Sequence, residues 1–321
     1  MPAHIAPMLA MLSELPEDSE EFAFEYKWDG VRAICFYDSG ELRIESRNLL
    51  DITMRYPELE SLSRLLKKRR VILDGEIVAM DENGRPSFAQ LQRRMHVQSK
   101  SAIARLVTQV PIFYVLFDVL YLDGNLLLDR AYEDRRHMLE KLGLKSDLFQ
   151  VTPAVVGSGE EMLESARDYG LEGVVAKRLD SVYEPGRRSP AWLKIKITQR
   201  QEFVIGGWVI EKTGREDRVG SLLLGYYDDA GKLRYAGAVG SGFSDLTHRD
   251  LVKQLLKLKR AENPFADALP KALARFVEPK LVAEIEYRRW PKGGMLQQAS
   301  FKGLRLDKPA REVVREVIHG S

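Results

Sequence analysis

Short apolar runs separated by turn residues fill the first part of the chain. Residues 22–27, 31–37 and 42–46 alternate around Gly and Asp turns, which predicts an antiparallel meander of strands. Apolar residues at helical spacing predict helices over 54–68, 88–107, 132–142 and 160–169. Further strands are expected at 71–73, 77–80, 112–121, 173–176 and 192–197. The mixture predicts an α+β fold with mostly antiparallel strands rather than alternating βαβ units.

The pattern changes near residue 200. Beyond it, short strands alternate with glycine-rich joints, and one helix is expected over 244–260. The predicted strands are 203–210, 221–227, 233–239, 281–290 and 299–303. Several short strands with one helix are typical of a small OB-type barrel. We therefore expect two domains, residues 1–200 and 201–321, of which the second has the OB fold.

Composition allows a large core and predicts no membrane segment. The chain has 321 residues and 45% hydrophobic content, enough for one large core or two of unequal size. Its longest apolar run, 110–122, is interrupted by Asp118 and is too short to span a bilayer. The first residues lack a signal-peptide pattern, so we expect a cytoplasmic protein. Cys35 is the only cysteine, which excludes an internal disulfide.

Charge is nearly balanced over the whole chain. The 49 Lys and Arg residues exceed the 47 Asp and Glu residues by only two, so net charge does not predict nucleic-acid binding. Basic residues do gather at 67–70, 93–94, 187–188, 194–200 and 288–289. Each run alone is typical of a solvated surface. Only their convergence in space would form a surface that follows phosphates.

Lys27 is the first candidate for chemistry. It ends the apolar run 22–27 and is followed by Asp29, Gly30 and Arg32. A lysine acts as a nucleophile once its ammonium group has lost a proton, and a strand end beside a glycine turn can favour that neutral form. Taken alone, a Lys-x-Asp-Gly-x-Arg match more often marks a charged strand end entering a tight turn.

Charged residues recur at the ends of other apolar strands, which predicts a shared polar cleft. The residues with this placement are Arg47, Glu76, Asp118, Glu172, Lys194 and Lys196. Lys194 and Lys196 are two apart on a predicted strand and therefore point to the same face. Near the C-terminus the chain adds Arg305, Asp307 and Lys308.

In this order the motifs resemble those of the covalent nucleotidyltransferases, most closely the ATP-dependent DNA ligases. Residues 27–32 match the KxDGxR motif of that family, and the later motifs follow in its order up to Arg305-x-Asp307-Lys308. Residues 24–30, 185–189, 204–208 and 303–308 are most similar to the ligase domain of bacterial end-joining (ligase D type) ligases. One position departs: after Arg47-Asn48 the family usually has a glycine, and this chain has Leu49.

The resemblance implies an ATP-grasp-like nucleotidyltransferase domain followed by an OB-fold domain. It also implies three steps. Lys27 first takes AMP from ATP and then passes this AMP to the 5′-phosphate of a DNA nick. The 3′-hydroxyl of the nick finally attacks that phosphate and displaces the AMP. In this scheme Arg305, Asp307 and Lys308 orient the leaving pyrophosphate. The OB domain closes on ATP and then moves away for DNA.

The resemblance also implies nucleotide and metal contacts. The base pocket is assigned to Glu25, Tyr26 and Phe117. The ribose or nick phosphate is assigned to Arg32, Arg47 and Glu76. The α-phosphate is assigned to Lys194 and Lys196. Glu76 and Glu172 are expected to coordinate a divalent metal, Mg²⁺ or Mn²⁺. Without the resemblance, Phe117 would be read as a core residue.

Nicked duplex DNA is the partner that the resemblance implies, for a monomer in the bacterial cytoplasm. End joining would add a Ku-like end-binding protein or a separate polymerase. The chain begins almost directly at the nucleotidyltransferase pattern, so no extra N-terminal DNA-binding domain is expected. Two alternatives remain: an RNA ligase or GTP-using capping enzyme, and a non-enzymatic OB module that binds nucleic acid. Lys27, Glu172, Lys194 and Lys196 argue against the second, because a pure binder has no use for a buried amine among carboxylates.

Overall fold

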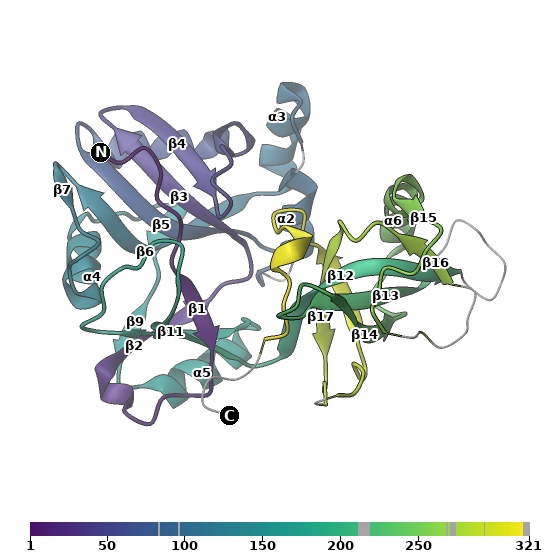
Figure 1. The fold of residues 1–321 in the computed structure, drawn as a ribbon. Coiled ribbons are helices and arrows are strands. Elements are labelled where there is room, and N and C mark those ends of the chain that lie inside the picture. The colour runs from purple at the N-terminus through teal and green to yellow at the C-terminus, as the bar shows by residue number, and fades with distance from the viewer. Residues whose placement is uncertain are drawn as a thin grey trace. The chain divides into compact units, whose positions relative to one another are not determined.

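The chain folds into two compact units, Met1–Ile197 and Thr198–Glu316 (Figure 1). The computed structural model describes residues 1–82, 84–95, 97–210, 219–267, 269, 274–291 and 293–316. Each unit combines a sheet or sheets with helices, and the predicted α+β fold class is confirmed.

The first unit contains two sheets. Its strands are β1 (Leu9–Leu12), β2 (Phe22–Lys27), β3 (Val31–Asp38), β4 (Glu41–Ser46), β5 (Arg70–Ala79), β6 (Ile112–Leu122), β7 (Asn125–Leu126), β8 (Phe149–Val151), β9 (Ala154–Val156), β10 (Gly173–Arg178) and β11 (Arg188–Lys196). One sheet has the order β1-β11-β10-β2-β9, and the other has β4-β3-β5-β6-β7 with β8 beside β6. All pairings are antiparallel except β1 with β11 and β6 with β8.

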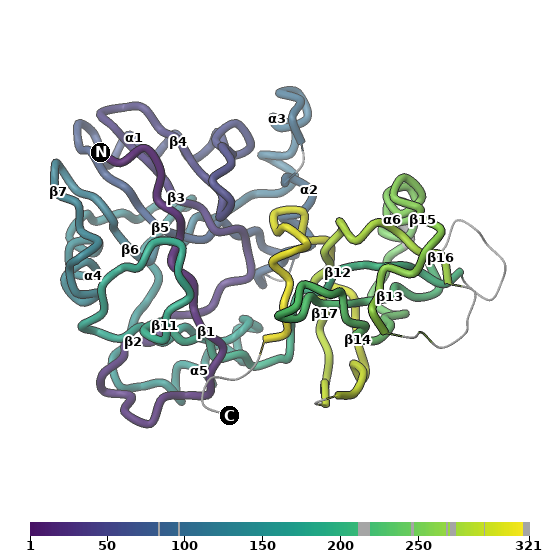
Figure 2. The backbone as a smooth tube through the Cα atoms, viewed as in Figure 1, coloured from purple at the N-terminus to yellow at the C-terminus, as the bar shows by residue number. Residues whose placement is uncertain are grey.

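Helices cover the outer faces of both sheets. They are α1 (Ser63–Leu66), α2 (Phe88–Met95), α3 (Lys100–Gln109), α4 (Tyr132–Lys141) and α5 (Gly159–Asp168), with short 3-10 turns η1 (Ser19–Glu21), η2 (Thr53–Arg55) and η3 (Pro57–Leu62). The helices α1 to α4 pack on the sheet that contains β3, and α5 packs on the sheet that contains β2 (Figure 2).

Alternation along β3 shows how one strand serves two cores. Ala33 and Cys35 face the helix-covered core, whereas Ile34 and Phe36 face the other sheet and pack with Trp192. Successive side chains of a strand point to opposite faces, so both faces of this strand are apolar because both are covered. The inner faces of the two sheets therefore meet in a layer of their own.

Several predicted elements differ from the observed ones. The helix predicted over 54–68 is split into η2, η3 and α1: Pro57 starts a new 3-10 turn, and Lys67 ends the segment at a positive φ of 53°. The helix predicted over 88–107 is two helices, α2 and α3. The break predicted at 74–76 is absent, since β5 runs through Gly75, where a Cβ would lie 2.5 Å from the Tyr114 ring. Local spacing does not reveal such packing.

The second unit is built on one sheet. Its elements are β12 (Gln199–Ile210), β13 (Val219–Tyr227), β14 (Leu233–Val239), α6 (Asp245–Lys257), β15 (Lys259–Arg260), β16 (Ala274–Val277), β17 (Val282–Tyr287), β18 (Ser300–Leu304) and η4 (Ala310–Glu312). Strand β12 is central: it pairs with β13, β16 and β17, and β18 adds to β17. The core contains Phe203, Leu222, Leu255 and Ile285. The predicted OB-type architecture is confirmed, and α6 is the one α-helix among the residues of this unit that the structure describes.

In the parts of the chain that the structure describes, no helix is long and apolar enough to cross a membrane.

Candidate active site

Lys27 is the last residue of β2 and stands just before the turn at Gly30. A Cβ on Gly30 would lie 2.2 Å from the carbonyl oxygen of Ile77, so glycine is required where the chain passes β5. Strand alternation places Glu25 and Lys27 on one face of the sheet. The opposite face carries residues such as Tyr26, which pack against α5.

Strand β10 aligns Lys27 with a second lysine. Gly173 is the cross-strand partner of Lys27 on β2 and of Lys196 on β11, so the two lysines flank it in one row. A Cβ on Gly173 would lie 2.0 Å from the carbonyl oxygen of Ile195, and its φ of 153° also favours glycine. The glycine lets the three strands approach closely at this point.

Glu172 lies between the two ammonium groups. One carboxylate oxygen, Oε2, accepts a hydrogen bond from Lys27 Nζ, and the other, Oε1, lies 3.9 Å from Lys196 Nζ. The side chains of Glu172 and Lys196 are only 8% and 9% exposed, and that of Lys27 is 22% exposed. The predicted residues Lys27, Glu172 and Lys196 therefore form one cluster with an accessible amine. Lys194 lies on the same face, opposite Val175.

Lys177 is a residue of this face to which the sequence analysis assigned no role. Its Nζ lies 2.8 Å from Glu25 Oε2 and donates to the carbonyl oxygen of Phe117 at 3.2 Å. Burial lowers the pKa of Lys177, although the charge of Glu25 opposes the shift. The signal was its spacing, since Lys177 follows Gly173 by four residues on one strand and so shares its face.

Glu25 is bound on several sides. Besides Lys177, it accepts a hydrogen bond of 2.5 Å from the hydroxyl of Tyr132, and Arg136 Nη1 lies 3.5 Å from the same oxygen. Burial and the charge of Glu25 raise the pKa of Tyr132 well above its ordinary value, so the hydroxyl stays protonated and donates. These contacts hold the carboxylate of Glu25 in a fixed position on the same face of the sheet as Lys27.

Phe117 lies in the layer between the two sheets. Its ring is 9% exposed and meets Trp192 edge-on at 6.4 Å. Two cations approach the ring: Lys177 Nζ at 4.4 Å and the Arg32 guanidinium at 4.6 Å from its centroid. These contacts are those expected if Phe117 is a core residue, and its stacking on adenine stays a prediction.

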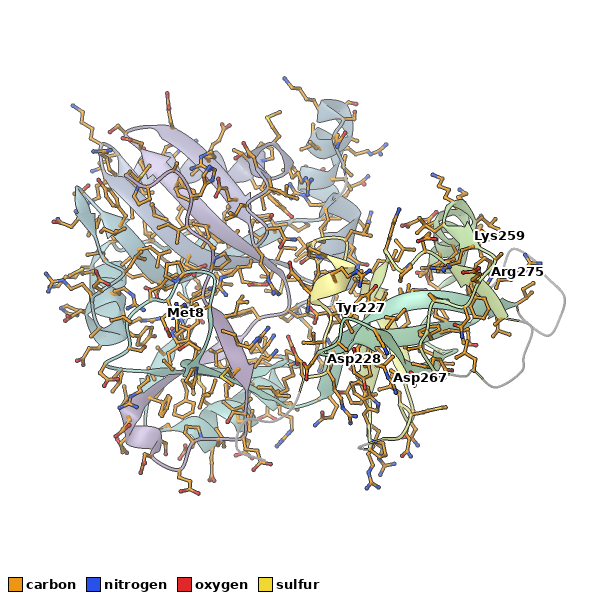
Figure 3. All side chains as sticks on the ribbon, viewed as in Figure 1. Met8, Tyr227, Asp228, Lys259, Asp267 and Arg275 are labelled. Carbon is orange, nitrogen blue, oxygen red and sulfur yellow. The ribbon has the colours of Figure 1, made fainter. Side chains whose placement is uncertain are left out.

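Arg32 points from β3 into the same layer. It donates from Nε and Nη2 to the two oxygens of Asp74, both at 2.6 Å, and from Nη2 to the carbonyl oxygen of Met8 at 3.3 Å. Figure 3 labels Met8 among the side chains of the first unit. Burial disfavours the charged guanidinium, but Asp74 outweighs burial and raises the pKa of Arg32. Glu76 is its cross-strand partner on β5. Arg32 thus brings Glu76 next to the interface of the two sheets.

Two of the predicted nucleotide contacts need qualification. The Tyr26 hydroxyl lies 2.8 Å from Ser165 Oγ on α5, so its side chain is on the face opposite Lys27 and only its backbone can line a pocket there. Arg47 lies in the turn after β4. That turn keeps a left-handed residue at Leu49, whose φ is 60°. The conformation suited to the family's usual glycine is therefore adopted by a leucine.

Asp118 is not part of a polar strand end. It lies inside β6, where Arg135 of α4 donates to its two carboxylate oxygens at 2.8 and 2.9 Å, and both side chains are fully buried. This pair ties α4 to the sheet. The expectation that Asp118 faces the shared cleft is wrong, because strand β6 continues to Leu122.

Arg305, Asp307 and Lys308 belong to the second unit. Arg305 donates from Nε and Nη2 to the two oxygens of Asp307 at 3.0 and 2.9 Å, and from Nη1 to Glu284 at 3.2 Å. Burial alone would raise the pKa of Asp307, but Arg305 holds it below its ordinary value. Lys308 Nζ donates to Glu202 at 2.9 Å. The three predicted residues thus form one charged cluster with Glu202 and Glu284.

The two carboxylates expected to hold a metal ion lie in the first unit. Within the described residues, no group of three or more His, Cys, Asp or Glu side chains could hold such an ion. A site of one or two carboxylates would need substrate phosphates and waters to complete the coordination of a divalent ion. Glu172 has a carboxylate on the Lys27 face, and Glu76 lies near the inner layer.

The α+β fold, with a lysine paired to a glutamate at a strand end, defines the class of covalent nucleotidyltransferases. The family model described as "ATP dependent DNA ligase domain" matches residues 6–196, and the family model described as "ATP dependent DNA ligase C terminal region" matches residues 215–308. The chain belongs to the ATP-dependent DNA ligase family.

Curated relatives support this assignment. The multifunctional non-homologous end joining DNA repair protein LigD of Mycobacterium tuberculosis is 41% identical over 317 residues, which are 98% of this chain and 40% of that protein. The LigD protein of Pseudomonas aeruginosa is also 41% identical, over 98% of this chain and 37% of its own length. A DNA ligase of Thermococcus onnurineus is 36% identical over 96% of this chain and 56% of its own. The chain thus spans only part of each of these relatives.

Solved structures show the same similarity. A mycobacterial DNA ligase D complexed with ATP and MES is 40% identical and covers 97% of this chain and 98% of its own, with a TM-score of 0.71. The ligase domain of M. tuberculosis LigD is also 40% identical with the same coverages and a TM-score of 0.55.

Proposed function

We propose that this chain is an ATP-dependent DNA ligase that seals nicks with a 3′-hydroxyl and a 5′-phosphate. The observation that carries the proposal is the cluster of Lys27 at the end of β2, Glu172 just before β10, and Lys196 at the end of β11. It places a partly exposed amine beside a buried carboxylate and a second cation. Such a site suits an amine that attacks a phosphate whose charge must be neutralised.

In the first step Lys27 Nζ attacks the α-phosphorus of ATP. Lys27 attacks as the neutral amine: the nitrogen–phosphorus bond forms, the nitrogen gives a proton to its hydrogen-bond partner Glu172, the bond to the bridging oxygen breaks, and pyrophosphate leaves with the electron pair. Glu172 holds the Lys27 amine in place, and Lys194 and Lys196 place positive charge at the α-phosphate. A divalent metal held by Glu172 and Glu76 would supply further neutralisation of the phosphates when bound.

The adenine end of the nucleotide is assigned to the buried network. Glu25, fixed by Lys177 and Tyr132, and the backbone of Tyr26 are proposed to line the base pocket, with Phe117 below it. Arg32 and Arg47 are proposed to contact the ribose or the nick phosphate. Fixed donors and acceptors reduce the reorganisation that nucleotide binding requires.

In the later steps the nick 5′-phosphate displaces Lys27 and takes the AMP, and the 3′-hydroxyl then attacks that phosphate and releases AMP. The energy of ATP is held in the lysyl-AMP bond until DNA arrives. Because relatives over this chain's whole length are named as end-joining proteins, we propose double-strand-break repair as its setting. A Ku-like end-binding protein or a separate polymerase is its proposed partner, and the chain itself is proposed to act as a monomer.

Nick sealing by wild type, Lys27→Ala and a control, Lys141→Ala on the exposed end of α4, tests the proposal. With α-labelled ATP we expect covalent label on wild type and on Lys141→Ala and none on Lys27→Ala. A nick already carrying AMP bypasses the first step, so Lys27→Ala should still seal it measurably. Covalent AMP on Lys27→Ala would show that the nucleophile is a different residue.

The same assay separates the alternatives. Label from GTP alone would identify a capping-type enzyme, and sealing of RNA nicks in preference to DNA nicks would identify an RNA ligase. Binding of nucleic acid without any covalent nucleotide would identify a non-enzymatic module.

A further inference from the structure

The charged cluster of the second unit contains two glutamates that the mechanism does not use. Glu202 of β12 and Glu284 of β17 are direct cross-strand partners. Like charges placed opposite each other destabilise an antiparallel pair. Their side chains are only 14% and 10% exposed, so water screens the repulsion poorly. Such a pair needs cations next to it.

Arg305 and Lys308 supply these cations. Arg305 uses three of its N–H groups toward Asp307 and Glu284, and Lys308 donates to Glu202. Burial opposes the charge on Arg305, but Asp307, Glu284 and Glu202 together raise its pKa well above its ordinary value. The two cations follow strand β18, which pairs with β17 through Glu284 and Gly303. The sheet register therefore aims each glutamate at one cation.

Long cationic side chains lose conformational freedom when they are fixed in one orientation. Carboxylates that hold them in the folded protein make that cost part of folding rather than of catalysis. We propose that Glu202 and Glu284 are positioning residues for the adenylylation step, which hold Lys308 and Arg305 in the orientation that receives pyrophosphate. The inference rests on the proposed function, in which these two cations act only while ATP is cleaved.

A step-resolved comparison tests it. The variants are Glu202→Gln and Glu284→Gln, and the matched control is Glu286→Gln. Glu286 lies on the same face of β17 two residues after Glu284 and binds Arg200 at 2.9 Å and Lys302 at 3.3 Å instead. Two rates are measured on the full chain: formation of lysyl-AMP from α-labelled ATP, and sealing of a nick that already carries AMP.

We expect Glu202→Gln and Glu284→Gln to slow lysyl-AMP formation by about 10- to 100-fold and to change sealing of the pre-adenylylated nick by less than about twofold. Glu286→Gln should change both rates by less than about twofold. Glu284→Asp, which keeps the charge on a shorter side chain, should recover part of the lost rate.

Unchanged lysyl-AMP formation, or equal losses in both reactions by a variant that retains its thermal transition, would overturn the inference. If either Gln variant loses its thermal transition, its Asp counterpart is measured and interpreted in the same way. Failure of the proposed function has a different signature, since wild type itself would then form no covalent AMP.

Discussion

Leu49 shows how a single residue can keep a loop shape that its side chain disfavours. Its φ of 60° lies in the left-handed region, and its amide donates to the carbonyl oxygen of Ser46 in a tight turn. An L-residue in this conformation carries a strain of roughly 1–2 kcal/mol. The turn is maintained nonetheless, because the amide of Ser46 also donates to the carbonyl oxygen of Leu50 at 2.9 Å.

Replacing Leu49 with glycine should therefore stabilise the protein. The relief of strain exceeds the extra flexibility of glycine in the unfolded chain, for a net gain of up to about 1 kcal/mol. Thermal and urea unfolding measure the change. Leu50→Gly is the control: Leu50 is also exposed but has no positive φ, so this change should destabilise by about 0.5–1 kcal/mol. A destabilised Leu49→Gly would show that the leucine side chain contributes more than its conformation costs.

The buried thiol of Cys35 makes the stability of the folded protein depend on pH. Burial raises the pKa of its thiol from an ordinary 9.0 to about 12. Below pH 9 the thiol is protonated in both states, so its contribution to stability is complete. Between pH 9 and 12 the unfolded chain releases the proton and the folded chain keeps it, so stability falls with rising pH, by up to about 1.4 kcal/mol per unit.

Urea unfolding of wild type and Cys35→Ala between pH 8 and about 10.5 checks this. Cys35→Ala should be less stable at pH 8 because it loses buried volume, and the gap should narrow as pH rises above 9. The tyrosines that titrate in this range are shared by both proteins and cancel in the difference. A gap that stays constant would contradict the assignment.

At the scale of elements, strand β10 organises the site. It is central in its sheet, and its first residue, Gly173, sets the spacing of β2 and β11 around Glu172. Local patterns predict β2 and most of β10, whereas β11 begins at Arg188, four residues before its predicted start. The break of 54–68 at Pro57 and the continuation of β5 through 74–76 are not predicted, because those outcomes depend on packing against other strands and helices.

Gly173→Ala should disrupt this arrangement. The added Cβ would meet the carbonyl oxygen of Ile195 at 2.0 Å, so β11 must shift. We expect the free energy of unfolding to fall by about 3 kcal/mol and lysyl-AMP formation to be lost. Gly40→Ala is the control. Gly40 also has a positive φ, 120°, but nothing lies within 4 Å of its Cβ position, so only backbone strain of about 1 kcal/mol is expected. Equal effects on lysyl-AMP formation would argue against the role of β10.

At the scale of the whole molecule, each unit has a hydrophobic core of its own. The first contains Leu73 in the helix-covered core, and the second contains Leu222, and both side chains are fully buried. Units with separate cores can unfold separately. We therefore expect two calorimetric transitions.

Matched cavity variants assign the transitions. Leu73→Ala should lower the temperature of one transition, and Leu222→Ala should lower that of the other. Each change should reduce the free energy of unfolding of its unit by about 3 kcal/mol. By the proposed function, ATP should raise the transition that Leu73→Ala lowers. One cooperative transition that both variants shift equally would contradict separate unfolding.

The amino-acid sequence is enough to predict the α+β class, most strands, and the identity and order of the charged residues that form the site. These follow from local rules: side chains of a strand alternate between faces, and glycine marks places where a turn or a close approach is needed. Local rules place Lys27, Glu172 and Lys196 at strand ends, and the resemblance of their motifs to those of the ligase family singles them out as site residues.

Which charged residues come into contact depends on how distant segments pair and pack. Lys27 and Glu172 are 145 residues apart, and Lys177 reaches Glu25 only because β10 pairs with β2 in one particular register. Other contacts depend on other distant elements: the packing of α4 on β6 pairs Arg135 with Asp118, and the register of β12 with β17 sets Glu202 opposite Glu284 beside Lys308. Register depends on the summed burial and pairing of distant strands, which no local pattern contains.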